Sequence, residues 1–314
     1  MIKTSQNAVR VFAPATVANV AIGYDILGFA LDRPGDELIA RRGSVPGVTI
    51  TKIHGTSKQL PKDPESNTCT KGVLQLLVDL KRTDECIEIE LFKKMPFGSG
   101  MGSSAASAAA GVMAVNELLG RPLAKRELAK YAVIGESAAD GAFHGDNVIP
   151  SLVGGIVLIR DNPSVDFVKL PIPKGLKAFV IYPEIEILTK DARAVLSDTV
   201  PLSSMISQTG HAAAFVASLY TSDFELMSRS LKDHVIEPQR ARLIPHFREL
   251  QEAALHAGAL NYTISGAGPS MFGFALNTLI AEQVTSAVQD ILQSHGIRSH
   301  HFISSINPVG AYKM

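Results

Sequence analysis

The alternation of apolar and polar positions predicts β-strands in the first part of the chain. Residues 8–13 and 45–53 are rich in side chains that favour strands, and residues 87–92 alternate between apolar and polar side chains. Between these strands, residues 70–80 repeat apolar side chains at helical spacing shortly after Asn67, a residue type favoured at helix starts. We therefore expect the chain to open with strand, helix and strand.

A loop rich in glycine and then a helix rich in alanine follow these elements. Residues 95–104 contain several chain breakers, and residues 105–119 have a strongly helical pattern. A second helix is predicted over residues 125–137. It leads through the polar loop 141–147, a candidate functional element, into a strand predicted over residues 152–159.

The pattern changes after Pro171 and Pro173, where we place a domain boundary. A chain of 314 residues is longer than a usual single core, so two domains are expected, over residues 1–170 and 171–314. The second domain is predicted to contain a strand over residues 177–182, helices over residues 205–219, 223–231 and 243–257, and then strand, helix and strand. Because strands and helices do not alternate regularly, an α+β fold is favoured over a doubly wound parallel sheet.

Composition and charge exclude several classes of protein. Hydrophobic residues make up 46% of the chain and charged residues 19%, which is typical of a globular protein. Thirty basic residues balance thirty acidic ones, so no global field favours nucleic acid or an anionic membrane. Cys69 and Cys86 are too few for a disulfide framework, and no apolar run reaches the roughly 20 residues of a membrane span. A cytoplasmic protein that binds neither nucleic acid nor membrane is expected.

The glycine-rich loop is the strongest candidate for chemistry. Gly98, Gly100 and Gly102 let the backbone turn tightly and direct N–H groups inward, and the helix that follows adds its positive dipole end. Such a site binds anions, most often phosphate. The loop has neither the lysine of a P-loop nor the dinucleotide spacing, and its glycines adjoin Ser99 rather than forming a nucleophile elbow. The alternative is a flexible connection in which Ser103 only caps the helix.

Three ordered segments resemble the motifs of the GHMP kinases. Residues 96–106 read Pro-Phe-Gly-Ser-Gly-Met-Gly-Ser-Ser-Ala-Ala, which is similar to the family's nucleotide-binding signature with Met101 in place of leucine. Residues 13–20 and 264–272 are similar to the flanking motifs. The resemblance implies an α+β fold in which an N-terminal ATP-binding domain is followed by a C-terminal ferredoxin-like domain.

Other segments are similar to the branch of the family that phosphorylates homoserine. They are residues 19–28, residues 144–148 followed by two glycines, and residues 189–193. The resemblance implies that L-homoserine and ATP are the substrates, that O-phosphohomoserine is made on the route to threonine, and that Mg²⁺ is required. A kinase of another small alcohol, such as mevalonate, and a ligand sensor without catalysis are the alternatives. Homodimers are common in the family.

The resemblance assigns the nucleotide and metal sites. The residues implied to bind ATP are Asn67, Pro96, Gly98, Ser99, Gly100, Met101, Gly102, Ser103 and Ser104. Asn67 lies in a segment similar to the family's adenine-contacting turn, although an Asx turn before a helix explains it equally well. Ser104 and Glu136 are implied to bind Mg²⁺, which prefers few protein oxygens together with phosphate oxygens.

Homoserine is a zwitterion, so its site needs a cation for the carboxylate and acceptors for the ammonium group. Arg193 and Arg240 suit the carboxylate because a guanidinium binds it through two parallel hydrogen bonds, and Asn19 and Asp25 suit the ammonium group. The resemblance adds three residues to the substrate site, His144, Asn147 and Thr189. One segment departs from the family pattern. Many members carry Asp-x-Ile-His-x-Pro-Tyr-Arg at the positions of residues 233–240, where this chain has Ile236 and Gln239 in place of His and Tyr and keeps Arg240.

Asp146 is the candidate for a group that acts on the acceptor hydroxyl. By resemblance it occupies the position that other GHMP kinases use for a catalytic aspartate. It is a candidate base, or a residue that only orients the hydroxyl. Together with Ser104 and Glu136 it completes the expected catalytic set.

Overall fold

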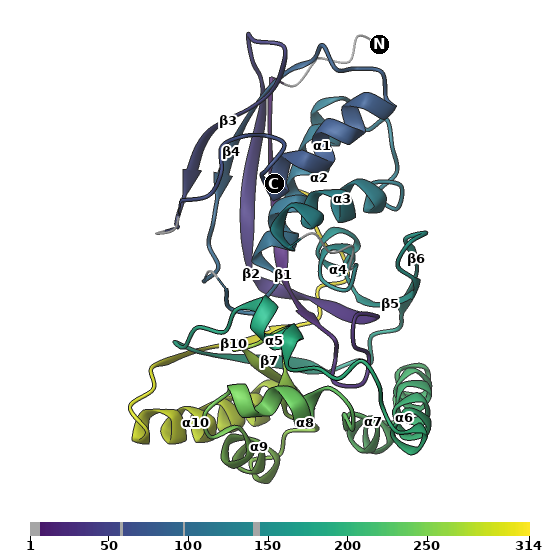
Figure 1. Ribbon diagram of the computed structural model, residues 1–314, viewed down its shortest axis with the longest axis vertical. Helices are drawn as coiled ribbons and strands as arrows, with labels where there is room; N and C mark the ends of the chain where they lie inside the picture. The colour runs from purple at the N-terminus through teal and green to yellow at the C-terminus, as the bar shows by residue number, and fades with distance from the viewer. Residues whose placement is uncertain (1–6, 57–58, 97, 141–144) are drawn as a thin grey trace.

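The computed structural model describes residues 7–56, 59–96, 98–140 and 145–314. Figure 1 shows a larger unit that contains the first described strand and the C-terminus, and a smaller unit that contains most of the C-terminal helices. Each unit is built on one β-sheet. The expected α+β fold is confirmed, since helices pack on mainly antiparallel sheets.

The larger sheet has seven strands in the described residues. In chain order they are β1 Ala8–Ala18, β2 Leu27–Arg42, β3 Gly47–His54, β4 Cys86–Phe92, β5 Ile156–Asp161, β6 Asp166–Leu170 and β11 Tyr312–Lys313. The order across the sheet is β11-β1-β2-β4-β3, and β5 pairs with both β2 and β6. All pairs are antiparallel except β3 with β4. The last strand thus returns the C-terminus to the edge of β1.

Four helices pack beside this sheet (Figure 1). They are α1 Thr68–Asp79, α2 Ser103–Leu118, α3 Ala129–Asp140 and α4 Val148–Val153. Helix α2 is buried from Ala105 to Leu118 because it lies between β1 and β2 on one side and α1, α3 and α4 on the others. Small alanine side chains let these neighbours approach closely, which explains the alanine-rich sequence.

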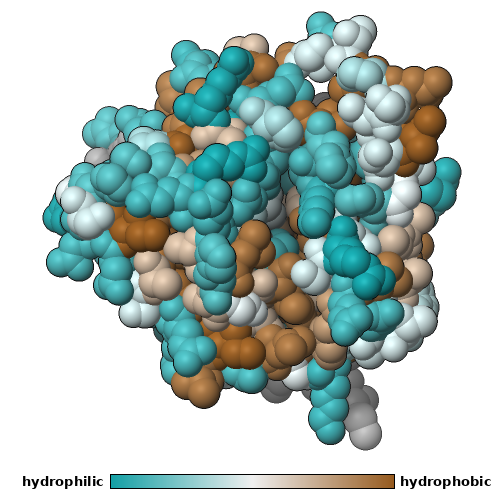
Figure 2. Space-filling model, turned by 90° about the horizontal axis from the view of Figure 1, so that it is seen from below, coloured by the Kyte–Doolittle hydropathy of each residue, from teal (hydrophilic) through white to brown (hydrophobic). Residues whose placement is uncertain are grey.

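The smaller sheet has the order β10-β7-β9-β8 and is antiparallel throughout. Its strands are β7 Lys177–Pro183, β8 Thr263–Ile264, β9 Met271–Ala275 and β10 Ser299–Ser305. The helices around it are α5 Thr189–Ala194, α6 Leu202–Thr221, α7 Phe224–Ser230, α8 Glu237–Arg240, the 3₁₀ turn Ala241–Leu243, α9 Phe247–His256 and α10 Thr278–Ser294. Figure 2, which views this end, shows apolar side chains interspersed among polar ones.

The two units share one hydrophobic core. Phe29 on β2 packs against Phe272 and Phe274 on β9, with ring centroids 5.7 and 5.1 Å apart. All three side chains are fully buried. A second, smaller core lies between the second sheet and α9 and α10. The division of the chain into two domains near residue 170 therefore stays a prediction. In the structure, side chains of both units pack into the same core.

Several predicted elements differ from the structure. The strand predicted over residues 152–159 begins only at Ile156, because Leu152 and Val153 end the buried helix α4 and two glycines with positive φ follow them. The sequence pattern missed β2, β6, β11, α4, α5 and α8. The predicted helix over residues 125–137 begins at Ala129. Among the described residues, no helix combines the length and the apolar character that crossing a membrane requires.

Candidate active site

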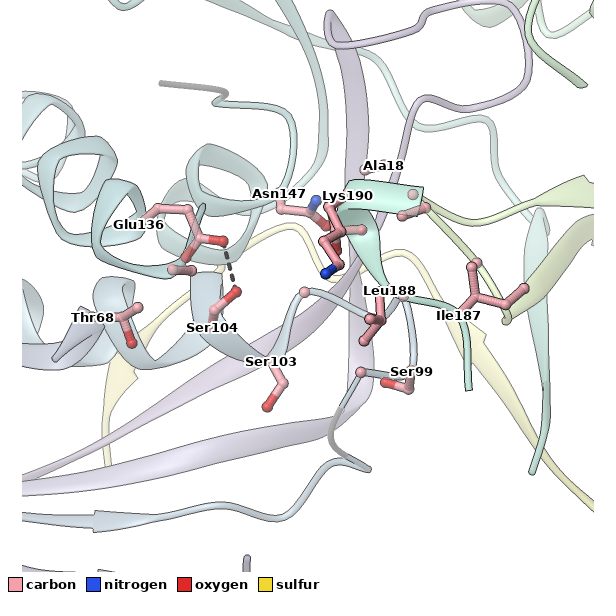
Figure 3. Close-up of a pocket in the computed structure, with 18 of the residues that line it drawn as sticks. Ala18, Thr68, Ser99, Ser103, Ser104, Glu136, Asn147, Ile187, Leu188 and Lys190 are labelled. Atoms are coloured by element: carbon pink, nitrogen blue, oxygen red, sulfur yellow. Dashed lines mark hydrogen bonds between the residues drawn. The ribbon is translucent and has the colours of Figure 1, made fainter. Parts of the chain in front are cut away.

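A cavity of about 760 Å³ lies between the two units. Its walls come from the glycine-rich loop, the starts of α1 and α2, the segment after β1, α5, α8 and residues 266–268. Figure 3 shows side chains from both units directed into it, including Ser104 and Glu136 from the larger unit and Lys190 from α5. A cleft of this size is in the usual range for a small-molecule site.

The glycine-rich loop forms one end of the cavity. Gly98, Gly100 and Gly102 have φ of 65°, 77° and 65°, the left-handed region that favours glycine. Space also restricts two of these positions: a Cβ at Gly102 would lie 2.1 Å from Thr16 Oγ1, and one at Gly100 would lie 2.7 Å from the Ser265 carbonyl oxygen. Residues of both units therefore contact the loop so closely that a side chain at either position would clash.

Hydrogen bonds hold the loop from both sides. The N–H of Thr16 on β1 donates to the carbonyl of Met101 at 3.1 Å. From the smaller unit, Ser265 Oγ donates to the carbonyl of Gly100 at 2.7 Å, and the N–H of Ser270 donates to that of Ser99 at 3.2 Å. These contacts argue against a flexible connection.

Helix α2 begins at the cavity wall, and no side chain caps its N-terminus. Gly102 is the residue before the helix and provides no side-chain cap, so the alternative in which Ser103 caps the helix is wrong. Ser103 is the first helical residue, and its hydroxyl donates to Asp36 at 3.2 Å. Asp36 also binds the buried ammonium of Lys93, which in turn donates to the Ser103 carbonyl at 2.7 Å. Within the described residues, the first N–H groups of α2 have no protein acceptor, so they can bind an anion.

Ser104 and Glu136 meet on the helix side of the loop. The Ser104 hydroxyl on α2 donates to Glu136 Oε1 on α3 at 2.6 Å (Figure 3). A hydroxyl and a carboxylate oxygen are the kind of donors that Mg²⁺ takes from a protein while it keeps water and phosphate oxygens. The donor set that the sequence suggested is therefore assembled, beside the loop where phosphates would lie.

The predicted nucleotide residues fall into two groups. Most line the cavity: Asn67, Gly98, Ser99, Gly100, Gly102, Ser103 and Ser104. Met101 is fully buried, and Pro96 is not among the described residues of the cavity wall. The Asn67 side chain caps α1 by accepting from the N–H of Cys69 at 3.0 Å and donates to the Pro61 carbonyl at 2.6 Å. Asn67 thus lines the cavity, while its side-chain oxygen and nitrogen both form hydrogen bonds within the protein.

Two arginines and a tyrosine form the other end of the cavity. The Tyr24 hydroxyl accepts hydrogen bonds from Arg193 Nη1 at 3.2 Å and from Arg240 Nη2 at 3.3 Å. Arg193 also lies 3.5 Å from Asp25 Oδ2. Arg240 is 4% exposed, and this burial lowers the pKa of its guanidinium. Sequence reasoning found the arginines but missed Tyr24, although it lies inside a matched motif.

Asn19 organises the turn that carries Asp25. Its Oδ1 accepts from the N–H of Asp25 at 3.0 Å, and its Nδ2 donates to the Gly266 carbonyl at 2.9 Å. The backbone of both residues is left-handed, with φ of 69° and 58°. Asn19 therefore places the Asp25 carboxylate and ties this turn to the smaller unit.

Asp146 is buried beside this turn, with 4% of its surface exposed. Burial and the negative charge of Asp25 raise the pKa of Asp146 to about 7, against its usual 3.8. The neighbouring Asn147 accepts a hydrogen bond from Thr16 Oγ1 at 2.7 Å. Thr189 also lines the cavity, whereas His144 lies outside the described residues. A carboxyl group with such a pKa can exchange a proton near neutral pH.

The departure at Ile236 and Gln239 leaves Arg240 in place. Gln239 Oε1 accepts from the N–H of Ser197 at 2.7 Å, and its Nε2 donates to the Val235 carbonyl at 2.6 Å. Its side chain thus binds the segment after α5. Arg240 reaches the cavity, where its Nη1 donates to the Gly266 carbonyl at 3.0 Å.

Comparisons with known proteins agree with this geometry. The family model "GHMP kinases N terminal domain" matches residues 68–155, and the model "GHMP kinases C terminal" matches residues 215–293. A homoserine kinase from Chlorobium phaeovibrioides is 44% identical over 97% of this chain and 98% of its own length. One from Xylella fastidiosa is 38% identical over 96% of this chain and 92% of its own length.

Solved structures of kinases are also similar to this chain. The crystal structure of homoserine kinase from Cytophaga hutchinsonii has a TM-score of 0.97 and 44% identity, and covers 100% of this chain and 99% of that one. A mevalonate kinase from L. major has a TM-score of 0.71 at 14% identity, over 98% of this chain and 99% of that one. At that identity the second likeness concerns the fold alone.

Proposed function

We propose that this chain, which belongs to the GHMP kinase family, transfers the γ-phosphoryl group of ATP to the side-chain hydroxyl of L-homoserine. The resemblance seen in the sequence is confirmed by relatives at 38–44% identity over nearly the whole chain. The observation that carries the choice of substrate is the far end of the cavity, where Arg193 and Arg240 lie beside the carboxyl groups of Asp25 and Asp146. This arrangement complements an amino acid zwitterion.

Membership of a kinase family implies ATP as the phosphoryl donor. The glycine-rich loop and the first turn of α2 would hold its phosphates through backbone N–H groups and the helix dipole. Ser104 and Glu136 would hold Mg²⁺, which neutralises charge on the phosphates as the phosphoryl group leaves. The turn around Asn67, together with Leu60, would form the wall for the adenine base.

The acceptor would lie with its carboxylate on the arginines and its ammonium group toward Asp25 and Asp146. Its hydroxyl would then point to the loop end of the cavity, where the phosphates bind. Asp146, whose pKa is near 7, would orient this hydroxyl or accept its proton during transfer. Placing both substrates in one cleft supplies most of the catalysis in phosphoryl transfer.

The alternative substrates fit this cavity less well. Mevalonate and related alcohols carry a carboxylate for the arginines but have no ammonium group for Asp25 and Asp146. Such a substrate would offer no positive group to Asp25 and Asp146. A non-catalytic sensor is not favoured either, since Ser104, Glu136 and Asp146 are all placed in the cavity.

An ADP-release assay across acceptors tests the proposal. Homoserine, mevalonate, shikimate and galactose would be compared at equal ATP and Mg²⁺. Homoserine is expected to give a much higher kcat/KM than the other three. A higher value for mevalonate or galactose would overturn the substrate assignment while leaving the kinase assignment intact.

The cytoplasmic setting remains a prediction from the composition, and the homodimer remains one from the family. Light scattering on the purified chain measures its oligomeric state. A mass of one chain at micromolar concentration would contradict the homodimer.

A further inference from the structure

Tyr24 joins the two arginines of the substrate end. Its hydroxyl accepts one hydrogen bond from each guanidinium, at 3.2 Å from Arg193 and 3.3 Å from Arg240. The Arg240 guanidinium also lies over the Tyr24 ring, 5.0 Å from its centroid. These residues come from the turn after β1, from α5 and from α8, so one phenol links three segments.

The Tyr24 hydroxyl has a hydrogen left to donate. A phenol can accept from two donors and still offer its own O–H. Within the described part of the chain, no acceptor for that hydrogen is found, and Tyr24 lines the cavity. A ligand atom that accepts hydrogen bonds would therefore meet an O–H as well as the two guanidinium groups.

Arg240 is held in a fixed orientation at this point. Its Nε donates to the carbonyl of Ala192 at 2.9 Å, and its Nη1 donates to that of Gly266 at 3.0 Å. With the bond to Tyr24, three of its five N–H groups are engaged, which leaves two for a ligand. The Tyr24 ring lies against the same guanidinium and limits its movement.

The charges at this end suit an anion between the arginines. Two guanidinium groups meet at one hydroxyl, and each disfavours the charge on the other. Arg193 also lies 3.5 Å from Asp25. A carboxylate bound beside Tyr24 would be attracted by both guanidinium groups.

We propose that Tyr24 binds the acceptor directly, by donating its hydroxyl hydrogen to the α-carboxylate of homoserine while it holds Arg193 and Arg240 on either side. The carboxylate site then has three donating groups rather than two. This assignment rests on the proposed function, because it takes homoserine as the acceptor. It makes Tyr24 a determinant of specificity for substrates that carry a carboxylate.

The test uses Tyr24→Phe, which keeps the ring over Arg240 and removes only the hydroxyl. We expect kcat/KM for homoserine to fall about 10- to 30-fold, chiefly through a higher KM, as is typical when a hydrogen bond to a charged group is lost. The KM for ATP should stay within about twofold of wild type. Tyr220→Phe, on the exposed face of α6, is the matched control and should behave as wild type.

Homoserine amide separates binding of the carboxylate from a structural role. Wild type should prefer homoserine to its amide strongly, and this preference should fall about 10-fold in Tyr24→Phe, because a contact that the amide cannot fully use is already missing. ADP affinity, measured by calorimetry, should be unchanged and shows that the variant is folded. If the preference is unchanged, or if both substrates weaken equally, Tyr24 does not bind the carboxylate. If wild type does not phosphorylate homoserine at all, the proposed function falls and takes this assignment with it.

Discussion

The protonation of Asp146 makes both stability and activity depend on pH. Its pKa in the folded protein is about 7, above the usual 3.8, because burial and Asp25 disfavour the charged form. A raised carboxyl pKa stabilises the fold below about pH 4, and this contribution is lost as pH rises through 7. A shift of about three units corresponds to about 4 kcal/mol.

We predict that Asp146→Asn removes this dependence. Between pH 4 and pH 8, the unfolding free energy of the variant should rise relative to wild type by up to about 4 kcal/mol, measured by urea denaturation. Activity should show the same group: kcat/KM for homoserine in wild type should rise with an apparent pKa near 7, and the variant should lack this step. Parallel stability curves for the two proteins would contradict the assignment.

The contact between Ser104 and Glu136 predicts how the metal is held. Glu136→Gln keeps the volume of the side chain but removes its charge, so turnover should fall at least about tenfold at an Mg²⁺ concentration that saturates wild type. ATP affinity measured without Mg²⁺ should not change. Glu249→Gln, on the exposed side of α9, is the control. Wild-type turnover in the first variant would show that Glu136 does not bind the metal.

At the scale of elements, α8 depends on one side chain that precedes it. The helix has only four residues, and Asp233 accepts hydrogen bonds from the N–H groups of Val235 and Ile236, just before the helix, and of Glu237, its first residue, at 2.8 to 3.0 Å. So short a helix has little stability of its own. The position of Arg240 at its end therefore depends on Asp233.

We predict that Asp233→Ala raises the KM for homoserine as well as lowering stability. The expected loss is about 1–2 kcal/mol of unfolding free energy, because three backbone N–H groups lose a charged acceptor, together with a rise in KM of about fivefold or more. Asp223→Ala offers a matched comparison, because Asp223 caps α7 by accepting from the N–H of Leu226 at 2.9 Å and lies outside the cavity wall. It should lose similar stability with KM unchanged. Equal KM values in the two variants would refute the role of Asp233.

The elements that the sequence predicted are those with local signals. The glycine loop and α2 follow from backbone freedom and helix pattern, and the structure places both as expected. Strand β2 was missed because its 16 residues include the segment 32–36, whose polar residues, proline and glycine are typical of a turn. Pairing with β1, β4 and β5 makes it a strand in spite of this.

Residues of the candidate site could be predicted where they lie in a motif similar to that of the family. Contacts between segments that are distant in the sequence could not be predicted. The contact of Tyr24 with Arg193 and Arg240 is of this second kind, since it requires the turn after β1 to face α5 and α8. No periodicity or spacing in the sequence predicts such a contact. The raised pKa of Asp146 also follows from burial, which only the folded chain shows.

The whole molecule is joined by aromatic packing between the two sheets. Phe29 lies in this shared core, in ring contact with Phe272 and Phe274. We predict that Phe29→Ala lowers the unfolding free energy by about 3–5 kcal/mol, as is usual when a large buried side chain is removed. Because the larger core contains residues of both units, wild type should unfold in one transition, with urea midpoints that coincide by far-UV circular dichroism and by hydrogen exchange in both sheets. Two resolved transitions would show that the units are independent.

The return of the chain to its first strand has a consequence for biosynthesis. Strand β11 pairs with β1, and the N–H of Met314 donates to the carbonyl of Arg10 at 2.9 Å, so β1 acquires this edge partner only after the residues that separate it from β11 have been made. The glycine loop likewise waits for residues 265–270, which hold it from the other side. At about 5–20 residues per second, a ribosome needs on the order of 15–60 s to add the residues between β1 and β11. During that interval the nascent larger unit has an unpaired strand edge at β1 and, until residues 265–270 are made, a glycine-rich loop without its contacts to the smaller unit.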